Sequence, residues 1–142
     1  MVFKIREGAR LYHGSPKKLK VLKPHYSRIV GMEVVYASQF KGVALCFAGK
    51  QWTDLDLDLG EINGVIHLKE LKPDAFDAFD CSGYLYRFNA EGFETHDNLA
   101  SFEVIGFKPI TDIRQESIEN IFRELRDTDI KLIYHPRSKR QH

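Results

Sequence analysis

The sequence predicts an α+β fold with a mostly antiparallel β core, split or arranged in two sheets, and few helices. Most apolar runs are short and rich in β-branched and aromatic residues, as strands are. Only two stretches have helical spacing, and the regular alternation of strand and helix that builds a parallel sheet is missing. The 142 residues contain no internal repeat and no long linker, so we expect a single domain over residues 1–142.

Six segments are expected to be strands because β-branched, aromatic or alternating apolar residues fill them between turn-forming residues. They are Arg10–His13, Glu33–Ala37, Gly64–Leu71, Tyr84–Phe88, Phe102–Phe107 and Ile130–Tyr134. In the fourth of these, Tyr84, Tyr86 and Phe88 share one side. Residues 17–32 mix lysine, proline and glycine without a period, and we expect them to be mostly loop.

Two helices are expected from apolar spacing. Phe40, Val43, Ala44 and Phe47 fall at i, i+3, i+4 and i+7, which predicts a helix over Gln39–Lys50. The second helix is predicted to begin at a capping box formed by Asp112 and Gln115. Its apolar stripe consists of Ile118, Ile121, Phe122 and Leu125.

Charge and composition exclude several classes of protein. The 21 basic and 20 acidic residues give a formal charge of +1, so no overall field favours nucleic acid or an anionic membrane. Only residues 135–142 are locally basic, and we expect a mobile solvated tail there, with an RNA or phosphate contact as the alternative. No run approaches the roughly 20 apolar residues of a membrane span. Met1–Glu7 lacks the apolar core of a signal peptide, and Cys46 and Cys81 lack metal or redox spacing. These features favour a cytoplasmic protein with free thiols.

No metal site is expected. The run Asp54–Glu61 alternates aspartate with leucine, but it lacks the glycine and the ligand spacing of a calcium loop. We expect a solvated strand face or loop there, opposite a buried leucine face. His67 is expected to face solvent, and His25 and His96 to lie in loops without a zinc-ligand pattern.

The first candidate site motif is His13-Gly14-Ser15, at the end of the first expected strand. Glycine lets a ligand approach the backbone without Cβ interference. A neutral imidazole beside it can donate to or accept from a sugar hydroxyl, and Ser15 adds a second hydroxyl. The alternative is a histidine with a purely structural role at a strand end.

The second candidate motif is Tyr36-Ala37-Ser38, at the end of the next expected strand. Tyr36 and Ser38 lie two residues apart and therefore point the same way. An aromatic face beside a hydroxyl suits a flat ring that carries an amide. The alternative is a core tyrosine followed by a strand-capping serine.

The order of the two motifs, followed by a helix rich in alanine and aromatics, resembles the ADP-ribosyltransferase superfamily, in its poly(ADP-ribose) polymerase and diphtheria-toxin branch. The likeness covers residues 10–50, and the remainder only in strand order. It implies an ADP-ribosyltransferase-like fold with NAD as the small-molecule substrate. His13 would bind a ribose hydroxyl, the Gly14 backbone and Ser38 would hold the nicotinamide carboxamide, and Tyr36 would stack on the ring. Phe47 is the nearest candidate for the second wall of the pocket, although its offset from Tyr36 departs from the family pattern.

The resemblance also implies a catalytic glutamate near the start of a later strand, for which Glu103 is the candidate. A fixed carboxylate near a developing oxocarbenium ion lowers the barrier to breaking a glycosidic bond. Strand parity would place Glu103 on the side of Ile105 and Phe107, which suits a carboxylate only if that side faces a cleft. Glu91 and Glu94 compete for the role. Ser101 stands where arginine-specific members carry a second acidic or amide residue.

Three functions therefore remain open. The first is an enzyme that cleaves nicotinamide from NAD and transfers ADP-ribose to an acceptor, protein or nucleic acid, that the sequence does not identify. The second is a non-catalytic NAD- or ADP-ribose-binding module of the same fold, or a related RNA 2′-phosphotransferase, which would need basic residues where Gly14 and Ser15 stand. The third is a structural or regulatory protein without a ligand.

Overall fold

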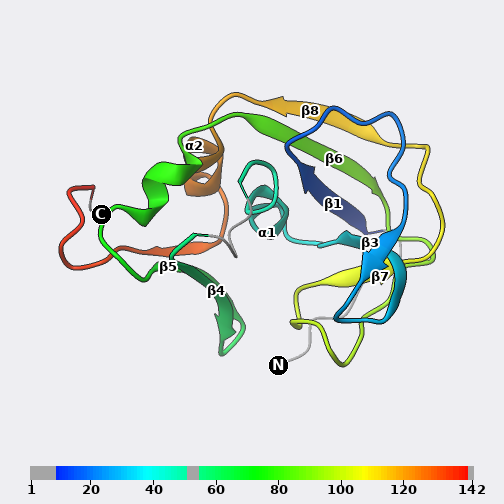
Figure 1. Cartoon of the computed structure of the whole chain (residues 1–142), viewed down its shortest axis with the longest axis horizontal. Helices are drawn as coiled ribbons and strands as arrows, with labels where there is room; N and C mark the ends of the chain where they lie inside the picture. The colour runs from blue at the N-terminus through cyan, green and yellow to red at the C-terminus, as the bar shows by residue number, and fades with distance from the viewer. Residues whose placement is uncertain (1–8, 51–54, 141–142) are drawn as a thin grey trace.

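The computed structural model describes residues 9–50 and 55–140, which form three three-stranded sheets and two short α-helices (Figure 1). The first sheet has the order β1 (Arg10–Ser15), β6 (Gly83–Asn89), β8 (Arg114–Ile118). The second has the order β2 (His25–Ser27), β3 (Met32–Ala37), β7 (Val104–Gly106). The third has the order β4 (Leu57–Ile62), β5 (Val65–Glu70), β9 (Lys131–Ile133).

All strand pairs of the described residues are antiparallel except β5 with β9. The α+β class with mostly antiparallel sheets is therefore confirmed. The sequence predicted a split sheet or two sheets, and the described residues form three. The helical elements are α1 (Lys41–Leu45), the 3₁₀-helix η2 (Ala75–Phe79) and α2 (Ile121–Arg126). None of the described helices has the length and apolar character to cross a membrane.

The helix expected over Gln39–Lys50 is much shorter, because α1 ends at Leu45. Beyond it the chain continues in tighter turns, in which each of the amides of residues 46–48 donates to the carbonyl three residues back. The segment lies directly on the first sheet at two glycines. A Cβ on Gly14 would stand 2.0 Å from the carbonyl oxygen of Ala44, and one on Gly83 would stand 1.9 Å from that of Ala48.

The second expected helix is wrong in its start. Asp112 and Gln115 do not cap it, because Arg114–Ile118 pairs with β6 as the strand β8. The helix begins after Asn120, whose side chain accepts a hydrogen bond from the amide of Arg123 (2.9 Å). Ile118 thus ends a strand.

The expected strands are all present, with shifted ends. The largest change is at Phe102–Phe107, where only Val104–Gly106 is strand, so the parity argument for Glu103 was wrong. The loop expected over residues 17–32 contains β2.

In the aspartate run, β4 buries Leu57 and Leu59 as expected, while Asp54 lies outside the described residues. His67 is buried, contrary to expectation, with Nε2 3.7 Å from Asp58 Oδ2.

Two groups of buried residues form the core. The larger joins α1 to α2, η2 and the inner faces of β4 and β5. The smaller lies between β6 and β3 and includes Tyr86 and Phe88, with Tyr84 packed against it, so the shared side expected for these three aromatics agrees with the structure. Since α1 touches β1 and shares the larger core with β4 and β5, it lies between the first and third sheets (Figure 1).

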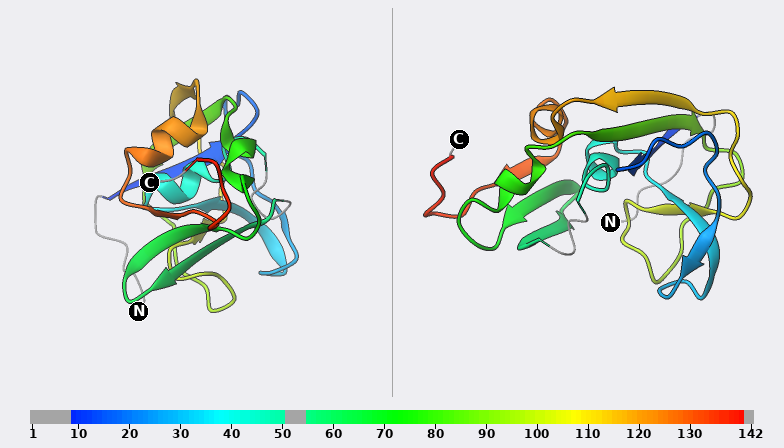
Figure 2. Two further views of the ribbon diagram at one scale, coloured as in Figure 1. Left: turned by 90° about the vertical axis from the view of Figure 1, so that its left-hand side faces the viewer. Right: turned by 45° about the horizontal axis from the view of Figure 1, so that its top comes forward.

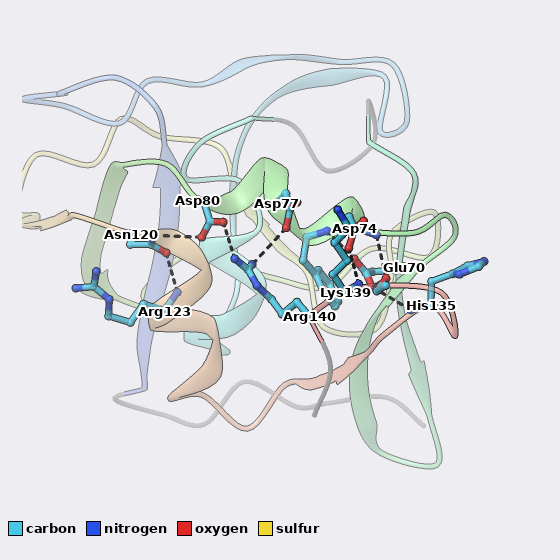
Figure 3. Close-up of polar contacts among 11 residues, drawn as sticks. Glu70, Asp74, Asp77, Asp80, Asn120, Arg123, His135, Lys139 and Arg140 are labelled. Carbon is cyan, nitrogen blue, oxygen red and sulfur yellow. Dashed lines mark hydrogen bonds and ion pairs between the residues drawn. The ribbon is translucent and has the colours of Figure 1, made fainter.

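The C-terminal segment is not the mobile solvated tail expected from its composition. The buried carboxylate of Glu70 accepts hydrogen bonds from the Ser138 hydroxyl (2.6 Å) and from the amides of Phe76 (2.9 Å) and His135 (3.0 Å). Further along, Arg140 pairs with Asp80 (2.7 Å) (Figure 3). The segment therefore turns back past the end of β5 and beside η2, at the end of the molecule opposite the β2–β3 hairpin (Figure 2). Residues 141–142 of the tail, and Met1–Glu7, lie outside the described residues.

Candidate functional site

A cavity of about 470 Å³ opens where the first and second sheets meet. The volume lies in the range of small-molecule sites, roughly 300–1,000 Å³. Every residue that the sequence singled out for a nucleotide site lines it. These are His13, Gly14 and Ser15 from β1, Tyr36 and Ser38 at the end of β3, Phe47 after α1, and Glu103 before β7.

The cavity exists because the ladder between β1 and β3 stops after one pair of hydrogen bonds. The backbones of Tyr12 and Ser38 exchange bonds of 2.8 and 3.0 Å. The next pair in this register would be Gly14 with Tyr36, but the Tyr36 carbonyl instead accepts from the His13 ring. Since residues two apart on a strand direct their backbone groups to the same edge, the N–H and C=O of Gly14 face the cavity side of β1.

His13 is fixed by that same hydrogen bond. Its Nδ1 lies 2.7 Å from the Tyr36 carbonyl oxygen, which can only accept, so Nδ1 carries the proton. In the neutral ring Nε2 is then an acceptor. Burial lowers the pKa of His13, with a contribution from nearby His25, although the hydrogen bond to Tyr36 opposes the shift. The ring therefore stays neutral, ready to accept a hydrogen bond from a hydroxyl in the cavity.

Tyr36 is held by its hydroxyl, which is hydrogen-bonded to the hydroxyl of Ser27 on β2. Ser27 is buried and also receives the amide of Val30 (3.2 Å). Because both ends of the Tyr36 side chain are thus fixed, its ring forms a rigid part of the cavity wall. Such a wall suits a planar ligand ring.

Ser38 joins the two halves of the site. Its hydroxyl donates to the carbonyl of Phe102 (2.7 Å) and accepts from the amide of Phe40 (3.0 Å). The hydroxyl hydrogen is therefore already used, and a ligand could only donate to the remaining lone pair. The bond to Phe102 also places the neighbouring residue, Glu103, at the cavity.

Glu103 presents a half-buried carboxyl to the cavity from a turn whose amide donates to the Ala100 carbonyl (3.0 Å). Burial raises the pKa of Glu103, and a hydrogen bond from the Ala100 backbone offsets part of the rise. The carboxyl makes no ion pair with any residue of the described ranges. A desolvated carboxyl in a cleft, with no structural cation, is typical of functional groups. Glu91 and Glu94 do not line the cavity.

The remaining two expected residues have local roles as well. Ser15 is buried, and its hydroxyl accepts from the amide of Lys17 (3.1 Å). Phe47 lines the cavity from the turn that follows α1, so it reaches the site without being part of a long helix.

Sequence reasoning missed three exposed residues of the cavity lining. Lys17, His25 and Ile29 line the cavity from the segment between the two motifs, for which the sequence predicts mostly loop and no site residue. The only sequence signal for these residues was their position, because the segment that connects the two motifs must pass close to the site that they form.

Within residues 9–50 and 55–140, no three histidine, cysteine, aspartate or glutamate side chains gather as a metal site would require. In comparisons with protein-family models, curated proteins and solved structures, nothing matches this chain.

Proposed function

We propose that this protein is an NAD-dependent ADP-ribosyltransferase, with an ADP-ribosyltransferase-like fold and the cavity as its nicotinamide site. The observation that carries the proposal is the carboxyl of Glu103, half-buried and with no ion-pair partner among the described residues, in one cavity with the fixed neutral imidazole of His13. The family resemblance of the two motifs also supports the proposal. It was drawn from the sequence alone, and the residues that carry it line one cavity.

The cavity offers a donor, an acceptor and two aromatic walls to a flat amide-bearing ring. The Gly14 backbone has an N–H and a C=O on the cavity side, which matches the acceptor and donor of a carboxamide. Tyr36 and Phe47 supply aromatic surfaces, and Nε2 of His13 can accept a hydrogen bond from a ribose hydroxyl. The Ser38 hydroxyl, whose hydrogen is committed to Phe102, would take a secondary part as an acceptor from the amide.

The reaction breaks the bond between the ribose C1′ and the nicotinamide nitrogen. The electron pair leaves with nicotinamide, which becomes neutral, and positive charge develops on the ribose. An ionised Glu103 would stabilise this charge electrostatically and hold the ribose hydroxyls. A nucleophilic acceptor, or water, then bonds to C1′ and releases its proton. Cytoplasmic location and a macromolecular acceptor are parts of this proposal.

A non-catalytic NAD-binding module is the second candidate, because Glu103 is the one residue that it would not need. An RNA 2′-phosphotransferase is disfavoured because it would need basic residues at the positions of Gly14 and Ser15. Gly14 is packed on α1 and Ser15 is buried, so neither could be replaced by a basic side chain in this fold.

Two measurements test the proposal. NAD should raise the melting temperature, because a ligand that binds only the folded state stabilises it. Incubation with NAD should release nicotinamide from the wild type, and Glu103→Gln should lower the rate by a factor of about 100 or more, the size seen when one transition-state electrostatic contact is removed. Glu94→Gln, an exposed carboxyl outside the cavity, is the matched control and should keep the wild-type rate.

The outcomes separate the candidates. A thermal shift with no release under any condition favours the binding module. Equal release by the wild type and Glu103→Gln contradicts the assignment of Glu103, and the absence of both shift and release contradicts the NAD site itself.

A further inference from the structure

The chain between the two motifs is strongly basic. Residues 16–32, which we name the basic rim, contain five lysines and arginines, and no aspartate or glutamate occurs between Glu7 and Glu33. The five are Lys17, Lys18, Lys20, Lys23 and Arg28, and all are exposed. Since the whole chain carries only +1, this charge is concentrated in one segment.

The charges of the basic rim are not used inside the protein. None of the five cations makes an ion pair with a residue in the part of the chain that the structure describes. The acidic residue nearest to these cations in the sequence is Glu33, which lies on β3 and pairs with Tyr26 on β2. A group of unneutralised cations raises the local concentration of anions around it.

The basic rim has a fixed backbone. The Tyr86 hydroxyl accepts from the amide of Leu19 (2.5 Å) and donates to the carbonyl of Lys17 (3.0 Å). The backbone of Leu22 pairs with that of Ile110 through bonds of 3.0 and 2.9 Å. The cations therefore extend from a preorganised support, which reduces the ordering cost of binding.

The basic rim also borders the cavity and exposes apolar surface. Lys17, His25 and Ile29 line the cavity. Within the basic rim, at the β2–β3 hairpin, Tyr26 is 68%, Ile29 58% and Met32 45% exposed. Exposed aromatic and apolar side chains among cations are the combination that binds single-stranded nucleic acids, because bases stack on the rings while phosphates meet the cations.

We propose that the basic rim binds a single-stranded nucleic acid through its phosphates, with Tyr26 stacking on a base, and so brings the acceptor to the mouth of the nucleotide cavity. That the bound nucleic acid is the acceptor rests on the proposed function, whereas its binding to the basic rim can be measured without NAD. A protein acceptor with an acidic surface would use the cations but would not need the exposed ring.

The test measures binding of fluorescent 20-nucleotide oligothymidylate and oligouridylate by anisotropy, without NAD, between 50 and 200 mM salt. The rim variant is Lys18→Gln/Lys20→Gln/Lys23→Gln, which leaves the cavity-lining Lys17 intact. The matched control, Lys69→Gln/Arg126→Gln/Lys131→Gln, removes three exposed cations that likewise lack ion pairs. They lie on the third sheet and α2, away from the β2–β3 hairpin (Figure 1).

The rim variant should weaken binding about tenfold or more and reduce the slope of log K against log salt by about 2, because each phosphate contact to a single strand contributes about 0.7. The control should stay within about twofold of the wild type. Tyr26→Ala should weaken binding at least about fivefold, the lower limit for one stacked base, and Tyr26→Phe should restore it. Equal loss in the rim and control variants, or a polyglutamate that binds as tightly as the oligonucleotides, would overturn the inference.

The NAD-induced thermal shift is recorded on the same proteins, so the two proposals fail separately. A shift without oligonucleotide binding refutes the rim and leaves the proposed function standing. Oligonucleotide binding without a shift supports the rim as a binding surface and refutes the NAD site. Loss of the NAD shift in the rim variant would assign these lysines to the phosphates of NAD and also overturn the inference.

Discussion

Replacing Gly14 by alanine tests how the cavity is built. The added methyl carbon would lie 2.0 Å from the Ala44 carbonyl oxygen and 2.8 Å from the Ala48 nitrogen, and both are backbone atoms. To reach an ordinary contact of 3.4 Å, α1 must move away from β1 by about 1.4 Å at Ala44. Overpacking of this kind costs about 1–3 kcal/mol, and we expect the upper end because a side-chain rotation cannot relieve the clash.

The assay is urea unfolding at pH 7, with thermal melts beside it. A loss of about 3 kcal/mol corresponds to a fall in melting temperature of roughly 10 °C, at about 3–4 °C per kcal/mol for a chain of this size. Gly83→Ala is the matched variant, because its methyl would stand 1.9 Å from the Ala48 carbonyl oxygen but outside the cavity. Both should destabilise the fold similarly, and only Gly14→Ala should also reduce the NAD-induced shift by more than its stability loss explains.

The reasoning fails if Gly14→Ala unfolds within about 0.5 kcal/mol of the wild type, the range of ordinary surface substitutions. It also fails if Gly14→Ala is destabilised while Gly83→Ala is not, since the two glycines face the same segment.

Ser138→Ala should destabilise the protein by about 1.5–3 kcal/mol in urea unfolding, because it removes a hydrogen bond to the buried carboxylate of Glu70. Glu103→Gln should melt at a higher temperature than the wild type at pH 7 but not at pH 4. The raised pKa of Glu103 means that the native protein loses stability as pH rises from 4.5 through that pKa, and glutamine does not titrate. An aromatic disulfide reagent should label Cys81 and not Cys46 in the native protein, because burial raises the pKa of Cys46 to about 12.

A loss below about 0.5 kcal/mol for Ser138→Ala would show that the C-terminal segment contributes little to stability. A Glu103→Gln protein that melts like the wild type at every pH would mean that the carboxyl is well solvated. Two thiols titrated at equal rates would contradict the burial of Cys46.

The residues that line the cavity were easier to predict from sequence than the helices were. His13 and Tyr36 lie near the ends of strands whose composition is unmistakable, and the end of a strand is where a side chain can reach a ligand. Gly14 could be interpreted as a place of close approach, but the sequence did not reveal that α1 and the turn after it would pack against it. Glu103 was placed by analogy, and its strand parity was wrong because it precedes β7.

The helices failed for a physical reason. Ile118, Ile121, Phe122 and Leu125 have helical spacing because they enter one core, yet Ile118 does so from a strand and the others from a short helix. Periodicity reports which side chains face the core and does not detect the break at Asn120. The prediction of a mobile solvated tail at the basic C-terminal segment was wrong for a related reason. Its partner, Glu70, lies about 65 residues away, and no local pattern connects them.

The single backbone pair between Tyr12 and Ser38 has a consequence for motion. Besides the smaller core, the two sheets are joined here by this pair and by the hydrogen bond from His13 to the Tyr36 carbonyl, which together form a narrow joint between them. A ligand that contacts β1 and β3 together would brace this joint. The amide hydrogens of Tyr12 and Ser38 would then exchange with deuterium more slowly, although neither hydrogen bond touches the ligand.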